Sequence, residues 1–312
     1  MATLITGSVA VDHIMAFNGR FQDIILPDKI HMLNVAFHVP TLRKTFGGCA
    51  ANIAYSLKRL GGDPLVAATV GSDFSSYANW LDEHGIRRDY IRELSGEATA
   101  GAFITTDSDD NQIIGFHSGA MDRAHEVSLS DINEEISLGI VSPNGKQAML
   151  EYARELKQQG VHTVIDPGQG LPQFSGDELI QLVDGADTYI VNSYEWELTL
   201  ERSGLTEREI KSRVKNTIVT LGEEGARADQ GDGEILIPSV EPDCVVDPTG
   251  CGDSFRAGYL FGIENGLSFQ ECLQLGSVMG SFMVEKDGTQ TIEVGTKGIR
   301  QRYEKTFGSL NL

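Results

Sequence analysis

The segment Asp247–Gly258, which reads DPTGCGDSFRAG, contains the residues with the clearest chemical meaning in this sequence. A strand over Cys244–Val246 is expected to lead into it, and a helical pattern follows through about Ile263. Glycines at a helix start let successive backbone N–H groups point at an anion, and the helix dipole adds to the attraction. Because an acid in such a loop would repel a phosphate, we expect Asp253 to accept a proton from a hydroxyl that attacks the phosphoryl group. The alternative is that Asp253 only caps the helix start.

Three further motifs contain residue types that bind sugars, metals or nucleotides. The pair Gly47–Gly48 precedes a helical pattern and would admit a ligand against the backbone, while Asn52 would donate to and accept from a sugar hydroxyl. Asn192 stands at a strand end, and Glu195 after it could order water around Mg²⁺. The turn Thr220–Gly225 follows another strand and would let the backbone approach a nucleotide. Each motif has an ordinary structural alternative: close packing, a helix cap and a plain turn.

The composition narrows the class of protein and of partner. The chain has 312 residues, of which 40% are hydrophobic and 22% charged, as in a folded globular protein. Lysine and arginine number 25 against 45 aspartates and glutamates, a formal net charge of -20. Such a chain is not expected to bind nucleic acid or an anionic membrane through bulk charge. A polyanionic ligand would have to be held locally, by backbone N–H groups or a metal.

The sequence predicts a cytoplasmic protein that does not cross a membrane. No stretch approaches the ~18 apolar residues that a membrane-spanning helix needs. Residues Met1–Asp12 lack the basic lead of a signal peptide. The four cysteines are scattered without a C-x-x-C pair, so reduced thiols are expected instead of a disulfide framework or structural zinc: Cys49, Cys244, Cys251 and Cys272.

Strand and helix patterns alternate along most of the chain, which favours an α/β fold with a doubly wound, mostly parallel sheet flanked by helices. The first buried strand is expected at Leu4–Val11, with Asp12 at its end. Further strands are expected at Pro64–Val70, Ser137–Val141, His162–Ile165, Thr188–Val191 and Thr217–Leu221, and helices at Gly48–Arg59, Ser75–Glu83, Gly145–Gln159 and Asp177–Asp184.

Two β-rich regions, at about 13–46 and 90–118, interrupt this alternation. In the second, Thr99–Thr106 and Gln112–His117 flank a turn-rich run and predict a hairpin. We expect the two insertions to form a small β-sheet lid over the site; the alternative is that they are surface excursions. The chain contains no long linker, so residues 1–312 are expected to form a single domain that carries the lid as insertions.

Taken together, the motifs resemble the PfkB, or ribokinase-like, family of carbohydrate and nucleoside kinases over essentially the whole chain. The amino-terminal signature of the family looks like Gly47–Gly61, and its carboxy-terminal signature D-T-x-G-A-G-D looks like Asp247–Asp253. Pro248 and Cys251 depart from the usual Thr and Ala, and neither change removes the N–H groups of the expected anion hole. A Walker A pattern and a complete G-x-G-x-x-G after the first strand are absent, which argues against a nicotinamide enzyme.

The resemblance implies a role for each residue of these motifs. Asp253 would be the catalytic base. The anion hole would consist of the N–H groups of Gly250, Cys251 and Gly252. Sugar hydroxyls would be held by Asp12, Gly47, Gly48 and Asn52, and ATP by Asn192, Thr220, Gly222 and Gly225. Mg²⁺ would be arranged through water by Asn192 and Glu195, and a monovalent cation such as K⁺ would lie by Asp247 and Thr249.

Within the family, the chain looks most like the bacterial adenosine kinases. The similar segments are His31–Val35, Asp107–Phe116 and Asp166–Gly170. A nucleoside needs an aromatic or apolar slot for its base. The candidates in the lid regions are Phe37, Phe103 and Phe116.

The expected reaction is therefore ATP-dependent phosphorylation of a ribose-type primary hydroxyl, adenosine and ATP giving AMP and ADP, in a crevice at the carboxyl ends of the strands. Closure of the lid would exclude water. A helix start should keep Asp253 ionised and weakly basic, so that it accepts the proton late. The alternatives are a sugar kinase for ribose, fructose or a keto-deoxy sugar acid, and a silent nucleoside-binding protein, against which the intact Asp253 and Glu195 argue. Edge strands of the lid sheet suggest a homodimer.

Overall fold

The computed structural model describes residues 2–231 and 233–310, so the two ends of the predicted domain 1–312 lie outside the described residues. In this part of the chain, nine strands form the main sheet, and six successive pairings in it are parallel. The pairings of β11 with β12 and of β12 with β13 are antiparallel. In sheet order the strands are β13 Glu234–Ile237, β12 Ala226–Asp229, β11 Asn216–Thr220, β10 Thr188–Asn192, β9 His162–Ile165, β8 Ile136–Val141, β1 Ala2–Thr6, β4 Pro64–Gly71 and β5 Arg87–Leu94.

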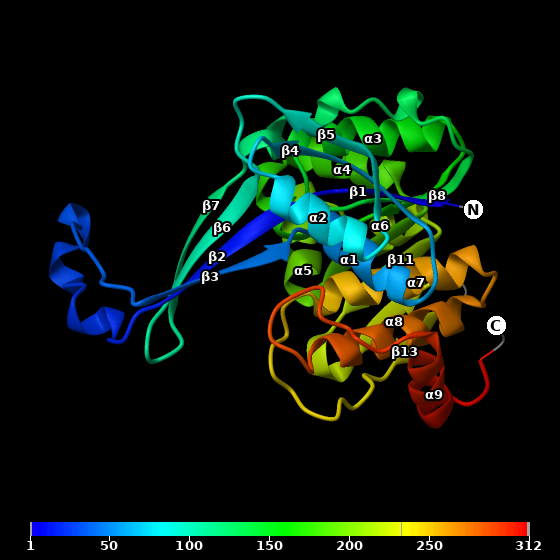
Figure 1. Cartoon of the computed structure of the whole chain (residues 1–312). Helices are drawn as coiled ribbons and strands as arrows, with labels where there is room; N and C mark the ends of the chain where they lie inside the picture. The colour runs from blue at the N-terminus through cyan, green and yellow to red at the C-terminus, as the bar shows by residue number, and fades with distance from the viewer. Residues whose placement is uncertain (1, 232, 311–312) are drawn as a thin grey trace.

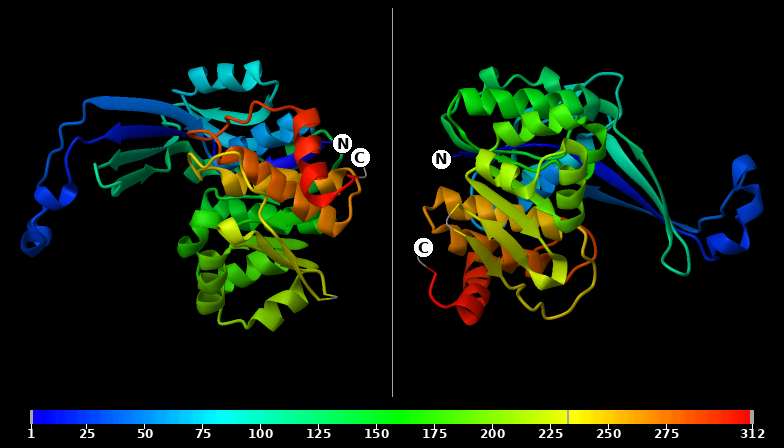
Figure 2. Two further views of the ribbon diagram at one scale, coloured as in Figure 1. Left: turned by 90° about the horizontal axis from the view of Figure 1, so that it is seen from below. Right: turned by 180° about the vertical axis from the view of Figure 1, so that it is seen from behind.

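Helices cover both faces of this sheet, which confirms the predicted α/β class (Figures 1 and 2). Neighbouring strand residues point to opposite faces, so Leu4 packs into one apolar core and Ile5 into the other. The core around Ile5 includes α1 Cys49–Arg59, α2 Ser75–Glu83, α7 Cys251–Glu264, α8 Phe269–Met283 and α9 Thr296–Phe307. The core around Leu4 includes α3 Lys146–Gln158, α4 Gly176–Gly185, α5 Ser193–Ser203 and α6 Glu207–Arg213.

A second sheet of four strands projects from one end of the main sheet (Figures 1 and 2). Its order is β3 Thr41–Gly47, β2 Ala10–Ala16, β6 Ala100–Thr106 and β7 Gln112–His117. The hairpin of β6 and β7 matches the predicted one, because Thr106 pairs with Gln112 across the turn. Residues 90–94 instead belong to β5, at the edge of the main sheet, so the predicted insertion at 90–118 began too early.

The prediction of one strand over Leu4–Val11 is wrong. The chain leaves the main sheet after Thr6, bends, and enters the second sheet at Ala10. The N–H of Ser8 donates to the carbonyl of Pro143 within this bend. Because residues on both sides of the bend are apolar, hydropathy carries no signal of the change of sheet. Asp12 therefore lies inside β2 and not beyond a strand of the main sheet.

Two further segments differ from simple strand patterns. The expected strand Cys244–Val246 is an irregular loop, in which the side chains of Val245 and Val246 are exposed. Its β-branched residues had favoured a strand, but in the described part of the chain the segment joins neither sheet. The connection from β2 to β3 contains two short 3₁₀ turns, Phe21–Asp23 and Pro27–Met32, and extends away from the body as an arm (Figure 1).

Candidate active site

A pocket of about 580 Å³ opens at the carboxyl ends of β9, β10 and β11, beside the start of α7. This is the edge of a parallel sheet where α/β proteins bind ligands. The pocket collects nine of the predicted site residues, namely Asn192, Glu195, Thr220, Gly222, Gly225, Gly250, Cys251, Gly252 and Asp253. The four predicted sugar ligands do not line it, although Cys49, at the start of α1, does.

The loop before α7 is shaped for close backbone approach. Gly250 adopts a left-handed conformation with φ 77° and turns the chain into the helix, which favours glycine at this position. The N–H groups of the first helical turn have no acceptors inside the helix and face its open end. One of the three predicted anion-hole donors is engaged internally, because the Cys251 N–H donates to the Pro248 carbonyl at 3.2 Å. In this form the loop therefore presents fewer donors than the sequence motif suggested.

Asp253 is half-buried at the wall of the pocket. Burial raises the pKa of its carboxyl to about 6, against the lowering effect of a hydrogen bond from Asn52 and of the positive charge of Arg256. The Asn52 Nδ2–H donates to Oδ2 of Asp253 at 2.8 Å. The expectation that the helix start makes this group a weak base is therefore wrong, because loss of hydration outweighs the interactions that favour the ionised form. A carboxylate with this pKa suits general-base chemistry near neutral pH.

An ion pair that the sequence motifs did not assign lies behind this loop. Arg256 is one turn beyond Gly252 on α7, and its guanidinium donates twice to the carboxylate of Asp166, once at 2.9 Å and once through Nε. Its Nη1 also donates to the carbonyl of Gly252 at 3.1 Å. Both side chains are buried. An arginine between the buried Phe255 and Ala257 was the available signal, because a buried cation needs a partner.

Asn192 and Glu195 form a reciprocal helix cap at the start of α5. The Glu195 N–H donates to Oδ1 of Asn192 at 2.8 Å, and the Asn192 N–H donates to Oε2 of Glu195 at 2.9 Å. The ordinary alternative for this motif is thus realised, yet both side chains also line the pocket. Burial and then the nearby negative charge of Asp166 raise the pKa of Glu195.

The donor set fits Mg²⁺ held mainly by phosphate oxygens and water. Within residues 2–231 and 233–310, no group of three or more His, Cys, Asp or Glu side chains is placed to hold a metal ion. Mg²⁺ commonly uses one or two carboxylates together with substrate phosphates. Glu195 can supply such a carboxylate at the pocket wall, whereas Asp166 is occupied by Arg256.

Asp247 organises the loop that precedes α7. Its Oδ1 accepts from the N–H of Thr249 at 2.9 Å and from its hydroxyl at 2.6 Å, and its Oδ2 accepts from the N–H of Gly288 at 2.8 Å. Burial alone would raise the pKa of Asp247, but these hydrogen bonds outweigh it and lower the pKa. The carboxylate is therefore ionised and rigidly held.

The glycines after β11 have different structural reasons. A Cβ at Gly225 would lie 2.0 Å from the carbonyl oxygen of Ile237, so close packing requires glycine there. Gly222 also has a positive φ, 62°, but a Cβ at this position would meet no heavy atom within 4 Å. Gly222 thus remains the position where a ligand can approach the backbone. Thr220 ends β11, with its hydroxyl 3.5 Å from the carbonyl of Val191.

Asp12 and the two glycines before α1 lie where the second sheet joins the body. Oδ2 of Asp12 is 2.8 Å from the position that a Cβ of Gly47 would take. Gly48 has φ 93°, and a Cβ there would meet the Ser8 carbonyl oxygen at 2.6 Å. Burial raises the pKa of Asp12. The link to the pocket is Asn52, whose side chain is buried and bonds to Asp253.

Strand register separates the three phenylalanines proposed for a base slot. Asp12 pairs with Ala102, and Ala102 pairs with Phe116, so Asp12 and Phe116 share one face of the second sheet. Phe103 lies on the other face, stacked on His13 at 4.5 Å between ring centroids. Phe37 packs in the arm against Phe17 and Phe21. Of the three, Phe116 alone shares the face of Asp12.

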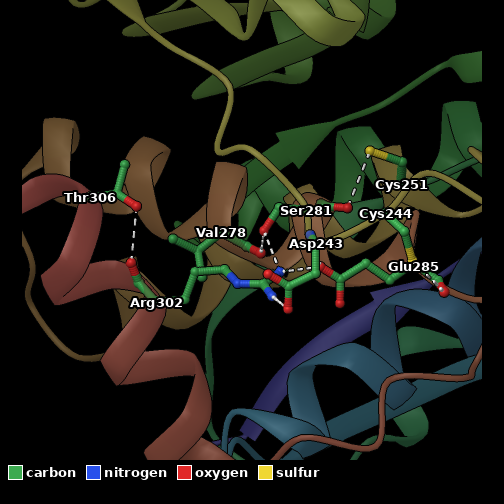
Figure 3. A network of polar contacts seen from close by, with 9 residues as sticks. Asp243, Cys244, Cys251, Val278, Ser281, Glu285, Arg302 and Thr306 are labelled. Atoms are coloured by element: carbon green, nitrogen blue, oxygen red, sulfur yellow. Dashed lines mark hydrogen bonds and ion pairs between the residues drawn. The ribbon is translucent and has the colours of Figure 1, made fainter.

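A polar network fixes the outer wall of the pocket (Figure 3). The guanidinium of Arg302, on α9, donates to Glu285 at 2.7 Å, to the Ser281 hydroxyl at 3.1 Å and to Asp243 at 3.2 Å. It also lies 3.6 Å above the ring of Phe282. The network ties α9 and the end of α8 to the loop after β13 that contributes to the pocket lining.

The comparisons with known proteins cover both sheets. Residues 6–295 match the pfkB family carbohydrate kinase sequence pattern. The chain is 33% identical over 277 residues to the nucleoside kinase of Methanocaldococcus jannaschii, covering 87% of this chain and 90% of that protein. The nucleoside kinase of Burkholderia thailandensis in complex with inosine is 44% identical, with TM-score 0.88 and 98% of each chain covered. Its complex with ADP-inosine gives TM-score 0.86 at 45% identity, covering 99% of this chain and 98% of that chain.

Proposed function

We propose that this chain, which belongs to the pfkB family of carbohydrate kinases, transfers the terminal phosphoryl group of ATP to the primary hydroxyl of a nucleoside, with adenosine as its main substrate. The observation that carries the proposal is Asp253, a carboxylate with a pKa of about 6 in a pocket at a helix start. The relatives named as nucleoside kinases, one of them bound to inosine, support a purine nucleoside as substrate.

The proposed chemistry follows from the placement of these groups. Asp253 accepts the proton of the attacking hydroxyl, and the open N–H groups at the start of α7 bind the transferring phosphoryl. ATP occupies the pocket against Thr220 and Gly222. Asn192 and Glu195 would hold Mg²⁺ through water, and Asp247 with Thr249 would hold a monovalent cation. Bound Mg²⁺ neutralises charge on the phosphates.

The face of the second sheet that carries Asp12 is suited to a nucleoside. Asp12 would accept hydrogen bonds from ribose hydroxyls. Three of the four residues in the next row on that face are apolar, because Ile14 pairs with Ile104 and Ile104 with Ile114, and the fourth is Arg43. Together with Phe116, the three isoleucines provide an apolar wall for a base, and closure of this sheet over the pocket would exclude water.

The opposite face of the second sheet supports a homodimer. Leu42, Phe103 and Ile113 lie on it, and all three are exposed. Exposed apolar side chains on a sheet face bounded by the open edge strands β3 and β7 favour association with a second copy of the same sheet. Sedimentation analysis of the wild type and of Phe103→Asp would test this: a dimer that the substitution dissociates supports the contact, and a monomeric wild type refutes it.

One assay distinguishes the nucleoside kinase from its alternatives. ADP release from Mg-ATP would be measured with adenosine, inosine, guanosine, ribose, fructose and a keto-deoxy sugar acid. The proposal expects adenosine to have the largest kcat/KM. A larger kcat/KM for inosine or guanosine would identify a different nucleoside as the main substrate. Faster reaction of a free sugar would favour a sugar kinase, and reaction with none would favour a silent binding protein.

A further inference from the structure

A chain of side-chain hydrogen bonds leads from Trp80 on α2 to Asp253 on α7. The indole Nε1–H of Trp80 donates to Oε1 of Gln290 at 2.8 Å. Nε2 of Gln290 donates to Oδ1 of Asn52 at 3.0 Å, and Nδ2 of Asn52 donates to Oδ2 of Asp253 at 2.8 Å. This series of hydrogen bonds therefore connects three parts of the fold to Asp253, the proposed base: the end of α2, the segment after α8, and α1.

The two ends of this hydrogen-bond series determine which atom donates and which accepts at each step. An indole N–H can only donate, so Trp80 requires the oxygen of the Gln290 amide to face it. The amide nitrogen of Gln290 then faces Asn52 and requires the oxygen of that amide. An ionised carboxylate can only accept, so Asp253 is satisfied by the remaining nitrogen of Asn52. Each amide orientation is thus consistent with its neighbours on both sides.

We infer that Gln290 and Trp80 are positioning residues that orient the amide of Asn52, so that it donates a hydrogen bond to the ionised form of Asp253. This inference rests on the proposed role of Asp253 as the base. It assigns Asn52 to the base, where the sequence motif had assigned it to the sugar. The carboxylate is then held in one rotamer and ready to accept a proton.

The conformation of Gln290 supports a specific role. Its side chain is only 3% exposed, and its φ is 57°. Among the described residues, Asp110 is the other non-glycine residue with a positive φ, and it lies in the exposed turn between β6 and β7. A buried non-glycine residue keeps such a conformation where the surroundings determine it strongly. Tyr77 adds to those surroundings, since its hydroxyl accepts from Nε2 of Gln290 and donates to the carbonyl of Gly47 at 2.7 Å.

Two charged groups and a thiol act on Asp253 together with the hydrogen bond from Asn52. Arg256, on α7, lowers the pKa of Asp253, and Asp166, after β9, raises it. Cys49, on α1, contributes a further lowering hydrogen bond. Burial is the largest effect and opposes ionisation. If Asn52 turned its amide oxygen toward Asp253, only the remaining groups would stabilise the negative charge of the carboxylate, and the pKa of Asp253 would rise.

The titration of Asp253 can be followed directly, by carboxyl-¹³C NMR of the full chain labelled at aspartate. Asp253→Asn identifies its resonance. Gln290→Met keeps the length of the side chain but removes both contacts with Asn52 and Trp80, and should raise the pKa of Asp253 by about one unit, the scale of a hydrogen bond to a charged group. Trp80→Phe keeps the aromatic ring without its donor and should raise the pKa in the same direction by less.

A matched control and a double variant separate positioning from structural loss. Tyr55→Phe removes a buried hydrogen bond from α1 to the carbonyl of Ile292, two residues beyond Gln290, and should leave the titration of Asp253 unchanged. Gln290→Met with Trp80→Phe should shift the pKa no further than Gln290→Met alone, because both changes release the same amide. Additive shifts, or an unchanged pKa in Gln290→Met, overturn the inference.

The titration does not depend on the proposed reaction, so the two proposals can fail separately. If Asp253→Asn keeps wild-type turnover, the base assignment fails while the NMR shifts still report on the amide chain. If Asp253→Asn is inactive and the pKa stays unchanged in Gln290→Met, the base stands and the positioning role fails. Should Gln290→Met not fold, Trp80→Phe provides the decision: an upward shift supports the inference, and the wild-type pKa refutes it.

Discussion

The guanidinium of Arg256 is bonded in a two-pronged arrangement to the carboxylate of Asp166, and both side chains are buried behind the turn at the start of α7. Arg256 also bonds to the carbonyl of Gly252, so the pair connects the first turn of α7 to the carboxyl end of β9. Two paired, planar groups hold an element more rigidly than a single point charge would. The position of the proposed phosphate site thus depends on an ion pair that the sequence motifs did not assign.

Breaking this pair from one side should be strongly destabilising. Arg256→Met leaves the buried carboxylate of Asp166 without its cation and close to Glu195, so the free energy of unfolding should fall by about 3–5 kcal/mol. Urea denaturation would measure the change. Arg256→Met combined with Asp166→Leu removes both charges and should recover much of the loss; equal instability of the single and double variants would contradict this account.

Replacing the proposed base should affect turnover more than binding. Asp253→Asn keeps the shape of the side chain and can still accept the hydrogen bond from Asn52, but it cannot take a proton. We expect kcat to fall by roughly 10²–10⁴, the usual contribution of a positioned acid or base, with the dissociation constant for adenosine nearly unchanged. Steady-state kinetics and calorimetry would measure the two quantities. Wild-type turnover would show that Asp253 only caps α7.

The pKa of about 6 for Asp253 predicts the pH dependence of the rate. The base must be ionised to accept a proton, and kcat/KM reports the ionisation of the free enzyme, so kcat/KM should be constant above neutral pH and fall as the pH drops through 6. Below that point the fall should be about tenfold per pH unit, as for a single essential base. A profile of kcat/KM from pH 4.5 to about 8.5 tests it. A plateau that extends to pH 4.5 would contradict the raised pKa.

The carboxyl group of Asp253 should lower the free energy of unfolding at neutral pH. Its folded-state pKa, about 6, lies above the ordinary 3.8, so its ionised form is disfavoured by folding. Relative to Asp253→Asn, the wild type should be equally stable below pH 4, become less stable as the pH rises from about 4 to about 6, and lose nothing further above that. The difference at pH 8 should be on the order of 1–3 kcal/mol. Thermal unfolding of both proteins across this range would measure it; equal stability at pH 8 would contradict the burial effect.

Local sequence patterns predicted most elements of the main sheet. Strand β9 and helix α2 begin and end at the predicted residues, because each has a clear apolar period between turn residues. The glycine motif before α7 also predicted a helix start with Asp253 at the pocket, since glycine spacing fixes the local backbone. These features depend on a few residues that are neighbours in the chain.

Features set by contacts between distant segments could not be predicted in this way. The chain changes sheets between Thr6 and Ala10 without a change in hydropathy, so Asp12 was placed on the wrong sheet. Which face carries Phe116 depends on pairing across three strands. Gln290 belongs to no recognisable motif, and its role becomes visible only once Trp80 and Asn52, from two different helices, are placed beside it.

Two glycines next to the site should respond differently to substitution. A Cβ at Gly48 would lie 2.6 Å from backbone atoms of Ser8 and Ala10, so Gly48→Ala should destabilise the fold by about 1–3 kcal/mol or more. At Gly252 the nearest group is Nη1 of Arg256, at 3.0 Å. Gly252→Val should therefore reduce phosphoryl transfer more than stability. Comparing the Tm with kcat for both variants tests this contrast, and equal loss of both quantities in both variants would refute it.

A substitution at Asp12 tests whether the second sheet binds the sugar. Its carboxylate offers only acceptors, which suits two neighbouring ribose hydroxyls that both donate. Asp12→Ala should weaken adenosine binding by about 1.5–3 kcal/mol, the scale of hydrogen bonds to a charged group. That loss corresponds to about ten- to a hundredfold in affinity, with ATP binding little changed. Titration calorimetry with each ligand would measure both affinities.

The decisive measurement pairs this variant with altered nucleosides. Adenosine analogues that lack the 2′ or 3′ hydroxyl should bind weakly to the wild type and lose little more on Asp12→Ala, because the same hydrogen bonds are already missing. A double-mutant cycle between Asp12→Ala and deoxyadenosine gives the coupling energy directly. The burial that raises the pKa of Asp12 adds a second signature: adenosine affinity should fall as the pH drops and the carboxyl protonates. Purely additive losses would show that Asp12 does not contact the ribose diol, and its assignment to the sugar would then have to be withdrawn.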